Sequence, residues 1–194
     1  MKELIFATNN PDKLKEIQDL LGANFKLNSL KDLDFFEDIP ETGDTLEINA
    51  SQKANFIYRL FNRDVFADDT GLEIDALKGK PGVLSARYAG PEKNSAANIK
   101  RVIHELKNAT NRKARFRTVI SLIINSKEFS FEGIVEGTIL KSPHGQKGFG
   151  YDPVFQPSGY TQTFAEMDLK QKNLISHRAI AFRKLVGFLK KGIY

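Results

Sequence analysis

Cysteine is absent from the 194-residue chain, so disulfide bonds and thiol catalysis are excluded. No hydrophobic run approaches the roughly 18–20 residues that a membrane-crossing helix needs. The N-terminus enters a strand-like segment, LIFAT, after a single positive charge, which is unlike a secretory signal. These absences fit a cytoplasmic protein and give no reason to expect a membrane partner.

Internal repeats and low-complexity tracts are also missing from the sequence. The turn-rich stretches at 78–82, 90–95 and 142–148 are too short to separate independent domains. A hydrophobic share of 41% and a charged share of 27% are ordinary for a globular protein. We therefore expect residues 1–194 to form a single domain, or two lobes that share one core.

The charge is moderately basic, with 29 Lys and Arg against 24 Asp and Glu and a net charge of +5. Such an excess favours polyanionic partners, among them nucleic acid, anionic lipid and phosphorylated small molecules. Simple solubility explains it equally well. Composition alone leaves both interpretations open.

Apolar periodicity alternates between helical and strand-like spacing along the chain. The expected helices lie at 10–22, 45–61, 95–107 and 176–189, and the expected strands at 4–7, 65–67, 116–124 and 129–140, the last broken near two glycines. The last helix should bury Ala179, Phe182, Leu185, Val186 and Leu189. This interleaving predicts a mixed α/β fold.

The first candidate site is the segment Thr8-Asn9-Asn10-Pro11-Asp12-Lys13, where a strand runs into a helix. Asn10 is a suitable N-cap and Pro11 suits the first helical position. A helix N-terminus exposes unpaired N–H groups that bind anions, and Lys13 adds a full positive charge. The segment lacks the spacing of a P-loop. A plain helix cap with a solvated lysine is the competing interpretation.

The second candidate site is Asp68-Asp69-Thr70-Gly71, which we expect to end the buried strand. Two adjacent carboxylates after such a strand are costly unless they bind a metal, transfer a proton or cap a turn. Mg²⁺ prefers carboxylate and phosphate oxygens together. An Asx turn at the strand end is an equally acceptable explanation.

Two further polar segments follow. In Gly148-Phe149-Gly150-Tyr151-Asp152-Pro153, glycines beside aromatic rings let a backbone approach a flat ligand, although a tight turn with core aromatics explains the composition too. Lys172, His177 and Arg178 lie at the start of the last expected helix, where clustered cations are unfavourable without an anion nearby. His104 and His144 have no comparable setting and are expected on the surface.

Six segments occur in a characteristic order over nearly the whole chain: ATNNPDKLKEI, FADDTGLEIDAL, PGVLSARYAG, EGTI, GFGYDPVF and KNLISHRAIAFRKL. With these segments the chain resembles the inosine triphosphate pyrophosphatase family, also called the non-canonical purine NTP pyrophosphatase or Ham1-like family. The resemblance implies two α/β lobes around a long mixed central sheet with a substrate cleft between them. It also implies a homodimer, a Mg²⁺ requirement, and hydrolysis of ITP, dITP and XTP to the monophosphate and pyrophosphate.

The resemblance assigns roles to the candidate residues. Asp69 matches the general base and metal carboxylate, and Thr70 matches a substrate contact. The remaining matches are substrate-binding positions: Thr8, Asn9, Asn10, Pro11, Asp12, Lys13 and Lys53 for the triphosphate, and Phe149, Gly150, Tyr151, Asp152, Lys172, His177 and Arg178 for the base and sugar.

One position departs from the family pattern. The family commonly places a metal-binding glutamate just before Asn-Ala, where this chain has Ile48, and Glu47 lies one residue earlier. We expect weakened metal affinity, with Glu47 or Asp68 partly substituting. A family member that binds nucleotides without cleaving them is therefore an alternative. A nucleic-acid-binding module is a second one, but the basic residues are dispersed and no known binding signature is present.

Overall fold

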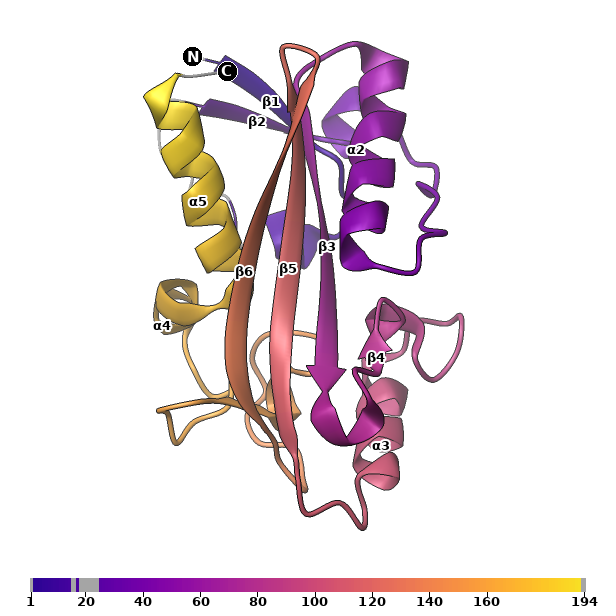
Figure 1. Ribbon diagram of the computed structural model, residues 1–194, viewed down its shortest axis with the longest axis vertical. Helices are drawn as coiled ribbons and strands as arrows, with labels where there is room; N and C mark the ends of the chain where they lie inside the picture. The colour runs from indigo at the N-terminus through magenta and orange to yellow at the C-terminus, as the bar shows by residue number, and fades with distance from the viewer. Residues whose placement is uncertain (1, 15–16, 18–24, 193–194) are drawn as a thin grey trace. The chain divides into compact units, whose positions relative to one another are not determined.

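The computed structural model describes residues 2–14, 17 and 25–192. Its strands are β1 (Lys2–Phe6), β2 (Phe25–Ser29), β3 (Val65–Ile74), β4 (Pro81–Gly82), β5 (Lys113–Ile124), β6 (Lys127–Ile139) and β7 (Phe155–Pro157), and its α-helices are α2 (Leu46–Phe61), α3 (Ser95–Glu105), α4 (Leu169–Ile175) and α5 (His177–Lys191). Short 3-10 turns lie at 31–33, 75–77, 85–87 and 152–154. Figure 1 shows these elements.

The strands pair in the order β2-β1-β3-β5-β6-β7, and β4 pairs with β3. β1 is parallel to both β2 and β3, whereas β4 is antiparallel to β3 and β7 to β6. β5 and β6 are joined by Asn125 and Ser126, with φ of 50° and 62°. Positive φ at both residues is typical of a two-residue hairpin turn that matches the strand twist. The expected mixed α/β fold is confirmed.

The chain divides into two compact units. Unit 1 comprises residues 1–69, 118–133 and 178–194, and unit 2 comprises residues 70–117 and 134–177. The chain leaves and re-enters unit 1 twice, at 69/70, 117/118, 133/134 and 177/178, so each unit depends on distant segments of sequence.

No helix among the described residues is long and apolar enough to cross a membrane.

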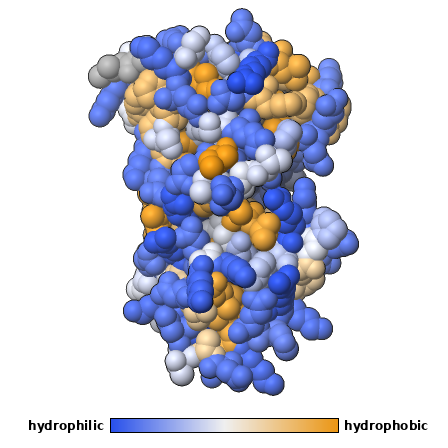
Figure 2. Space-filling model, turned by 45° about the vertical axis from the view of Figure 1, so that its right-hand side comes forward, coloured by the Kyte–Doolittle hydropathy of each residue, from blue (hydrophilic) through white to orange (hydrophobic). Residues whose placement is uncertain are grey.

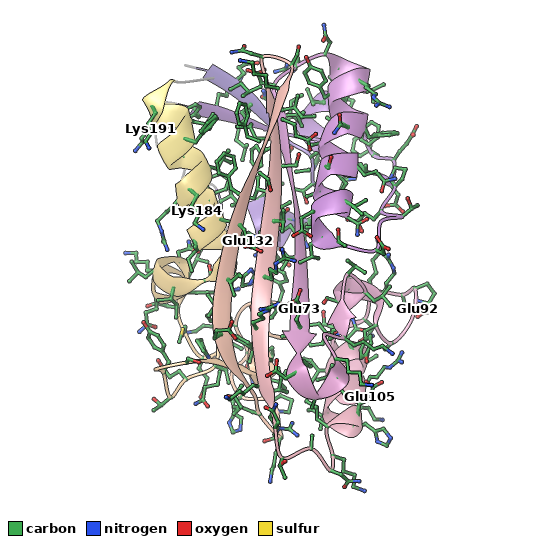
Figure 3. All side chains as sticks on the ribbon, viewed as in Figure 1. Glu73, Glu92, Glu105, Glu132, Lys184 and Lys191 are labelled. Carbon is green, nitrogen blue, oxygen red and sulfur yellow. The ribbon has the colours of Figure 1, made fainter. Side chains whose placement is uncertain are left out.

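Unit 1 is a three-layer sandwich in which α5 covers one face of the strands and α2 covers the other (Figure 1). Residues alternate between these faces along β1: Leu4 and Phe6 pack with the buried side of α5, and Ile5 packs with α2. This period of two is what a strand buried on both faces requires. On α5, the Lys184 ammonium donates to the Glu132 carbonyl of β6 at 2.7 Å, and Figure 3 labels both residues.

Unit 2 has its own hydrophobic core, formed by its parts of β3, β5 and β6 together with α3 and the segment before α4. Phe116, Phe155 and Phe164 are its central rings, with centroid distances of 4.6 Å and 5.3 Å along that series. Large aromatic rings contribute much buried area per residue, so this cluster is a major part of the core of unit 2. Most of the surface seen in Figure 2 is hydrophilic, with small hydrophobic patches between the polar side chains.

Helix boundaries agree well with the sequence. Thr45 caps α2 by accepting from the Ile48 amide at 3.2 Å, and the five residues expected inside α5 are all buried. The first expected helix is observed at 11–14 and at Ile17, and its remainder lies outside the described residues. The helix α4 and the strands β2, β4 and β7 were not expected.

Two strand predictions are wrong. β3 does not end at Asp68 but continues to Ile74, because Leu72 and Glu73 pair with β4. Gly71 is needed there for close approach rather than for a turn, since a Cβ at this position would lie 2.8 Å from the Gly82 carbonyl oxygen. β6 runs unbroken through both of its glycines to Ile139.

Candidate functional site

The segment after β1 forms the expected helix cap. The Asn10 carboxamide oxygen accepts from the backbone amides of Asp12 at 2.9 Å and Lys13 at 3.4 Å. The Thr8 hydroxyl, which is buried, accepts from the Asn10 amide at 3.2 Å. Asn9, Pro11 and Asp12 are more exposed. The cap thus fixes the direction of the first helical turn and of Lys13 on it.

Asp68 is almost completely buried and lies between two cations. The Lys13 ammonium donates to Asp68 Oδ1 at 2.9 Å, and Arg178 Nε, at the start of α5, lies 3.6 Å from Asp68 Oδ2. Burial raises the pKa of Asp68, but the charges of Lys13 and Arg178 outweigh it and hold the pKa far below its ordinary value. The anion that the basic start of α5 needs is therefore Asp68.

Asp69 has a different environment. Its Oδ2 accepts from the Asn49 amide at 3.1 Å, and its Oδ1 lies 3.4 Å from the Lys53 ammonium. Burial is the largest influence and raises the pKa of Asp69, while Lys53 and Lys13 lower it less than burial raises it. Asp69 is therefore a stronger base than an ordinary aspartate, which suits a group that takes a proton from water.

The two aspartates differ because neighbouring residues of a strand point to opposite faces. Asp68 lies on the same face of β3 as Phe66, the face covered by α5. Asp69 lies on the same face as Ala67, the face covered by α2. Each oxygen of Asp68 faces a cation. The geometry therefore disfavours the expectation that Asp68 substitutes as a metal ligand.

Sequence reasoning missed Glu41, which precedes α2 in a loop. Its carboxylate Oε1 accepts from the Lys53 ammonium, which also faces Asp69, so one buried lysine contacts two carboxylates. Burial lowers the pKa of Lys53, but the negative charges of Asp69 and Glu41 raise it by more. The pKa of Lys53 therefore lies above its ordinary value. Glu47 is exposed on the first turn of α2. No periodicity marks a loop glutamate, so only the tertiary structure identifies Glu41.

The donor set suits a cation that arrives with phosphate. Within residues 2–14, 17 and 25–192, no three His, Cys, Asp or Glu side chains lie close enough together to hold a metal ion. Glu41 and Asp69 supply two carboxylates on either side of Lys53. Mg²⁺ in phosphate chemistry commonly takes one or two carboxylates, substrate oxygens and waters, so these two residues fit it.

A second cluster of candidate residues lies in unit 2. Asp152 Oδ2 accepts from the Lys172 ammonium at 2.7 Å and from the Phe149 amide at 2.9 Å. Gly148 has a φ of 72°, and a Cβ there would lie 2.1 Å from Asp152 Oδ2, so only glycine permits this turn. The Lys172 ammonium lies 4.9 Å above the half-buried Phe149 ring. Asp152 thus holds a buried lysine against an aromatic ring.

The other candidate residues in unit 2 differ in their exposure to solvent. Tyr151 is buried, and its hydroxyl donates to the Ser85 carbonyl oxygen at 2.9 Å, while burial raises its pKa. His177 stacks on Phe116 with a centroid distance of 4.7 Å. Gly150 and Thr70 are partly exposed. His104 and His144 are exposed, as expected.

The candidate residues therefore form two groups. Unit 1 holds the cations Lys13, Lys53 and Arg178 with the paired aspartates, and unit 2 holds the aromatic turn with Lys172 and His177. The first group combines cations with carboxylates, and the second combines a lysine and a histidine with aromatic rings.

The comparisons identify the class. A sequence model of the Ham1 family matches residues 4–188, and the chain belongs to this family. It is 51% identical to the dITP/XTP pyrophosphatase of Christiangramia forsetii over 97% of this chain and 100% of that protein. It is 47% identical to the dITP/XTP pyrophosphatase of Bacillus subtilis over 97% and 98% of the two chains. The solved Ham1 protein of Staphylococcus aureus superimposes with a TM-score of 0.90 at 38% identity, covering 98% of this chain and 100% of that one.

Replacing Asp68 by Asn should destabilise the protein by about 3–5 kcal/mol, because Lys13 and Arg178 then lose their buried counter-charge. The pKa of Asp68 is lowered by folding, so its stabilisation is present above the ordinary aspartate pKa and is lost as the pH falls through the lowered value. Urea titrations from pH 7 down to about pH 1 measure both effects. The variant should lose stability at pH 7 and show a shallower acid dependence.

The matched control is Asp38→Asn, at an exposed position. It should stay within about 0.5 kcal/mol of the unsubstituted protein. Equal stability of the Asp38 and Asp68 variants at pH 7 would contradict the buried ion-pair account.

Proposed function

We propose that this chain hydrolyses the non-canonical purine nucleoside triphosphates ITP, dITP and XTP to the monophosphate and pyrophosphate, which removes them from the nucleotide pool. The observation that carries the proposal is Asp69, a buried carboxylate of raised pKa beside Lys53. Relatives that share about half of their residues with this chain and align over nearly its whole length are named as dITP/XTP pyrophosphatases. The alternative of a member that only binds nucleotides has no support from these relatives.

The cations of unit 1 hold the triphosphate in this proposal. Lys13 supplies an ammonium donor next to the positive end of a helix, and Lys53 adds a second ammonium. Together their positive charges offset the negative charge of the triphosphate, which the water must approach when it attacks the α-phosphorus. Asp69 accepts the proton of the attacking water, and Lys53 beside it keeps the carboxylate ionised.

Glu41 and Asp69 are the residues that would hold a divalent metal, and we propose Mg²⁺. A bound metal would neutralise charge on the pyrophosphate leaving group. Asp68 holds Lys13 and Arg178 in place instead. The family commonly has a glutamate at the position of Ile48. In this proposal its absence matters less, because Glu41 places a second carboxylate beside Lys53, which also contacts Asp69.

The aromatic turn of unit 2 recognises the base in this proposal. Lys172 is a donor with no acceptor function, so it satisfies a purine 6-oxo group and leaves the 6-amino group of adenine facing another donor. Asp152 and Phe149 fix its ammonium group. An unpaired buried polar group costs about 1–3 kcal/mol, which is enough for useful discrimination between dITP and dATP.

We also propose that residues 1–194 act as one domain and that the protein is a homodimer. The repeated passage of the chain between the two units supports the first statement. The family resemblance supports the second. Sedimentation velocity distinguishes a dimer from a monomer.

Asp69→Asn should lower kcat for dITP by about 10²–10⁴-fold, because the variant side chain cannot accept the proton of water. KM should change little, since the phosphate-binding lysines remain. Pyrophosphate release with Mg²⁺ is the measurement, and Asp75→Asn, at an exposed position of unit 2, is the control. Undiminished turnover in the Asp69 variant would refute its role, and tight dITP binding without turnover by the unsubstituted protein would favour the non-hydrolysing alternative.

Lys172→Gln should reduce the ratio of kcat/KM for dITP to that for dATP by about 5–150-fold, which corresponds to the loss of about 1–3 kcal/mol of discrimination. Glutamine can still donate to Asp152 but also offers an acceptor to adenine. Lys170→Gln, on the same helix but exposed, is the matched control. An unchanged ratio in the Lys172 variant would show that the base is recognised elsewhere.

A further inference from the structure

The loop that carries Glu41 is held by side chains of the helix that follows it. The Gly43 amide donates to the Asn49 carboxamide oxygen at 2.8 Å. The Thr42 amide donates to Gln52 Oε1 at 3.0 Å, and Gln52 Nε2 donates back to the Thr42 hydroxyl at 3.0 Å. Three hydrogen bonds from the first two turns of α2 therefore fix two consecutive residues next to Glu41.

Asn49 makes a second contact with its other amide atom. Its Nδ2 donates to Asp69 Oδ2 at 3.1 Å, and the side chain is only 1% exposed. The partners determine the orientation of the amide, because the Gly43 N–H needs the oxygen and the carboxylate needs the N–H group. One rigid, planar group thus joins the loop to the aspartate.

The loop also lies directly against the helix. A Cβ at Gly43 would be 2.4 Å from Ile48 Cγ2 and 2.9 Å from Asn49 Oδ1. Any larger residue at this position must displace the loop from the helix. This contact gives Ile48 a role despite its 48% exposure, because its side chain covers the backbone of Gly43.

We propose that Asn49 is a positioning residue that sets the spacing and orientation of the Glu41 and Asp69 carboxylates for a divalent cation. The inference deepens the proposed function and rests on it. Asn49 acts through Gly43 on one side and Asp69 on the other, without touching the substrate. Groups that orient metal-binding side chains commonly change metal affinity or activity by 10–100-fold when they are removed.

A purely structural role for Asn49 gives different expectations. If the amide only satisfied a buried carboxylate, its removal would lower the stability of the protein and leave metal binding intact. Asn49→Leu, which has a similar volume and no polar atom, tests this. Gly43→Ala is the second variant, because it displaces the same loop and leaves both hydrogen-bonding groups of Asn49 in place.

The first measurement uses the metal-free protein. Amide hydrogen exchange followed by NMR reports on the Gly43 and Thr42 N–H groups directly. In Asn49→Leu the Gly43 amide should exchange at least about tenfold faster. Asn55→Ala, on the same helix and bonded to Ser51 and Glu128, is the control and should leave both amides unchanged.

The second measurement is binding of Mn²⁺ alone, followed by electron paramagnetic resonance. Asn49→Leu and Gly43→Ala should each weaken Mn²⁺ binding by about 10–100-fold, with a similar loss in kcat for dITP and a smaller change in KM. Asn55→Ala should bind Mn²⁺ like the unsubstituted protein. The split between kcat and KM separates positioning of the carboxylates from binding of the nucleotide.

The inference is overturned if Asn49→Leu, or Gly43→Ala where the leucine variant does not fold, retains Mn²⁺ affinity and kcat within about twofold. It is also overturned if the Gly43 amide keeps its protection in Asn49→Leu. If the unsubstituted protein binds Mn²⁺ but does not cleave dITP, the proposed function fails, and the exchange and Mn²⁺ data still decide the role of Asn49.

Discussion

The arrangement of unit 1 depends on the burial of two consecutive carboxylates in the middle of a sheet. Asp68 and Asp69 are 2% and 9% exposed, and ionised groups at such positions need opposite charges or hydrogen-bond donors. Because β3 is extended through them, the two side chains leave the strand on opposite faces. Each therefore requires its own partners, and those partners come from different helices.

This requirement organises distant parts of the chain around β3. Asp68 draws in Lys13, after β1, and Arg178, at the start of α5. Asp69 accepts a hydrogen bond from Asn49 and pairs with Lys53, both from α2. Lys53 also pairs with Glu41. Burial raises the pKa of both acids and nearby cations lower it, but the cations outweigh burial only at Asp68, so the pKa of Asp68 is lowered and that of Asp69 is raised. One acid is thereby suited to anchoring cations, and the other to accepting a proton.

Sequence reasoning succeeded where local chemistry decides the structure. The Asn10 cap, the start of α2 near Thr45 and the buried face of α5 follow from short-range spacing, and the structure confirms them. The ordered motifs identified the family over nearly the whole chain, which the match over residues 4–188 confirms. Reasoning of this kind works because capping and amphipathic spacing depend on residues only a few positions apart.

The failures have tertiary causes. Asp, Thr and Gly favour turns, but β3 lies between β1 and β5 in the sheet and continues through 68–71 to residues 72 and 73, which pair with β4. Gly137 marks a close approach rather than a break, since a Cβ there would lie 2.4 Å from the Gln156 carbonyl oxygen of β7. Glu41 was missed because a carboxylate in an irregular loop has no periodic signature, whereas Glu47 and Asp68 lie in or next to motifs of the family.

The central claim is that Asp69 directs water to the α-phosphorus of a non-canonical purine triphosphate. Hydrolysis of dITP in ¹⁸O-labelled water, with mass spectrometry of both products, tests this most directly. The account predicts that the label enters the nucleoside monophosphate and that the other product is unlabelled pyrophosphate. Label in the pyrophosphate, or release of inorganic phosphate with a nucleoside diphosphate, would contradict it.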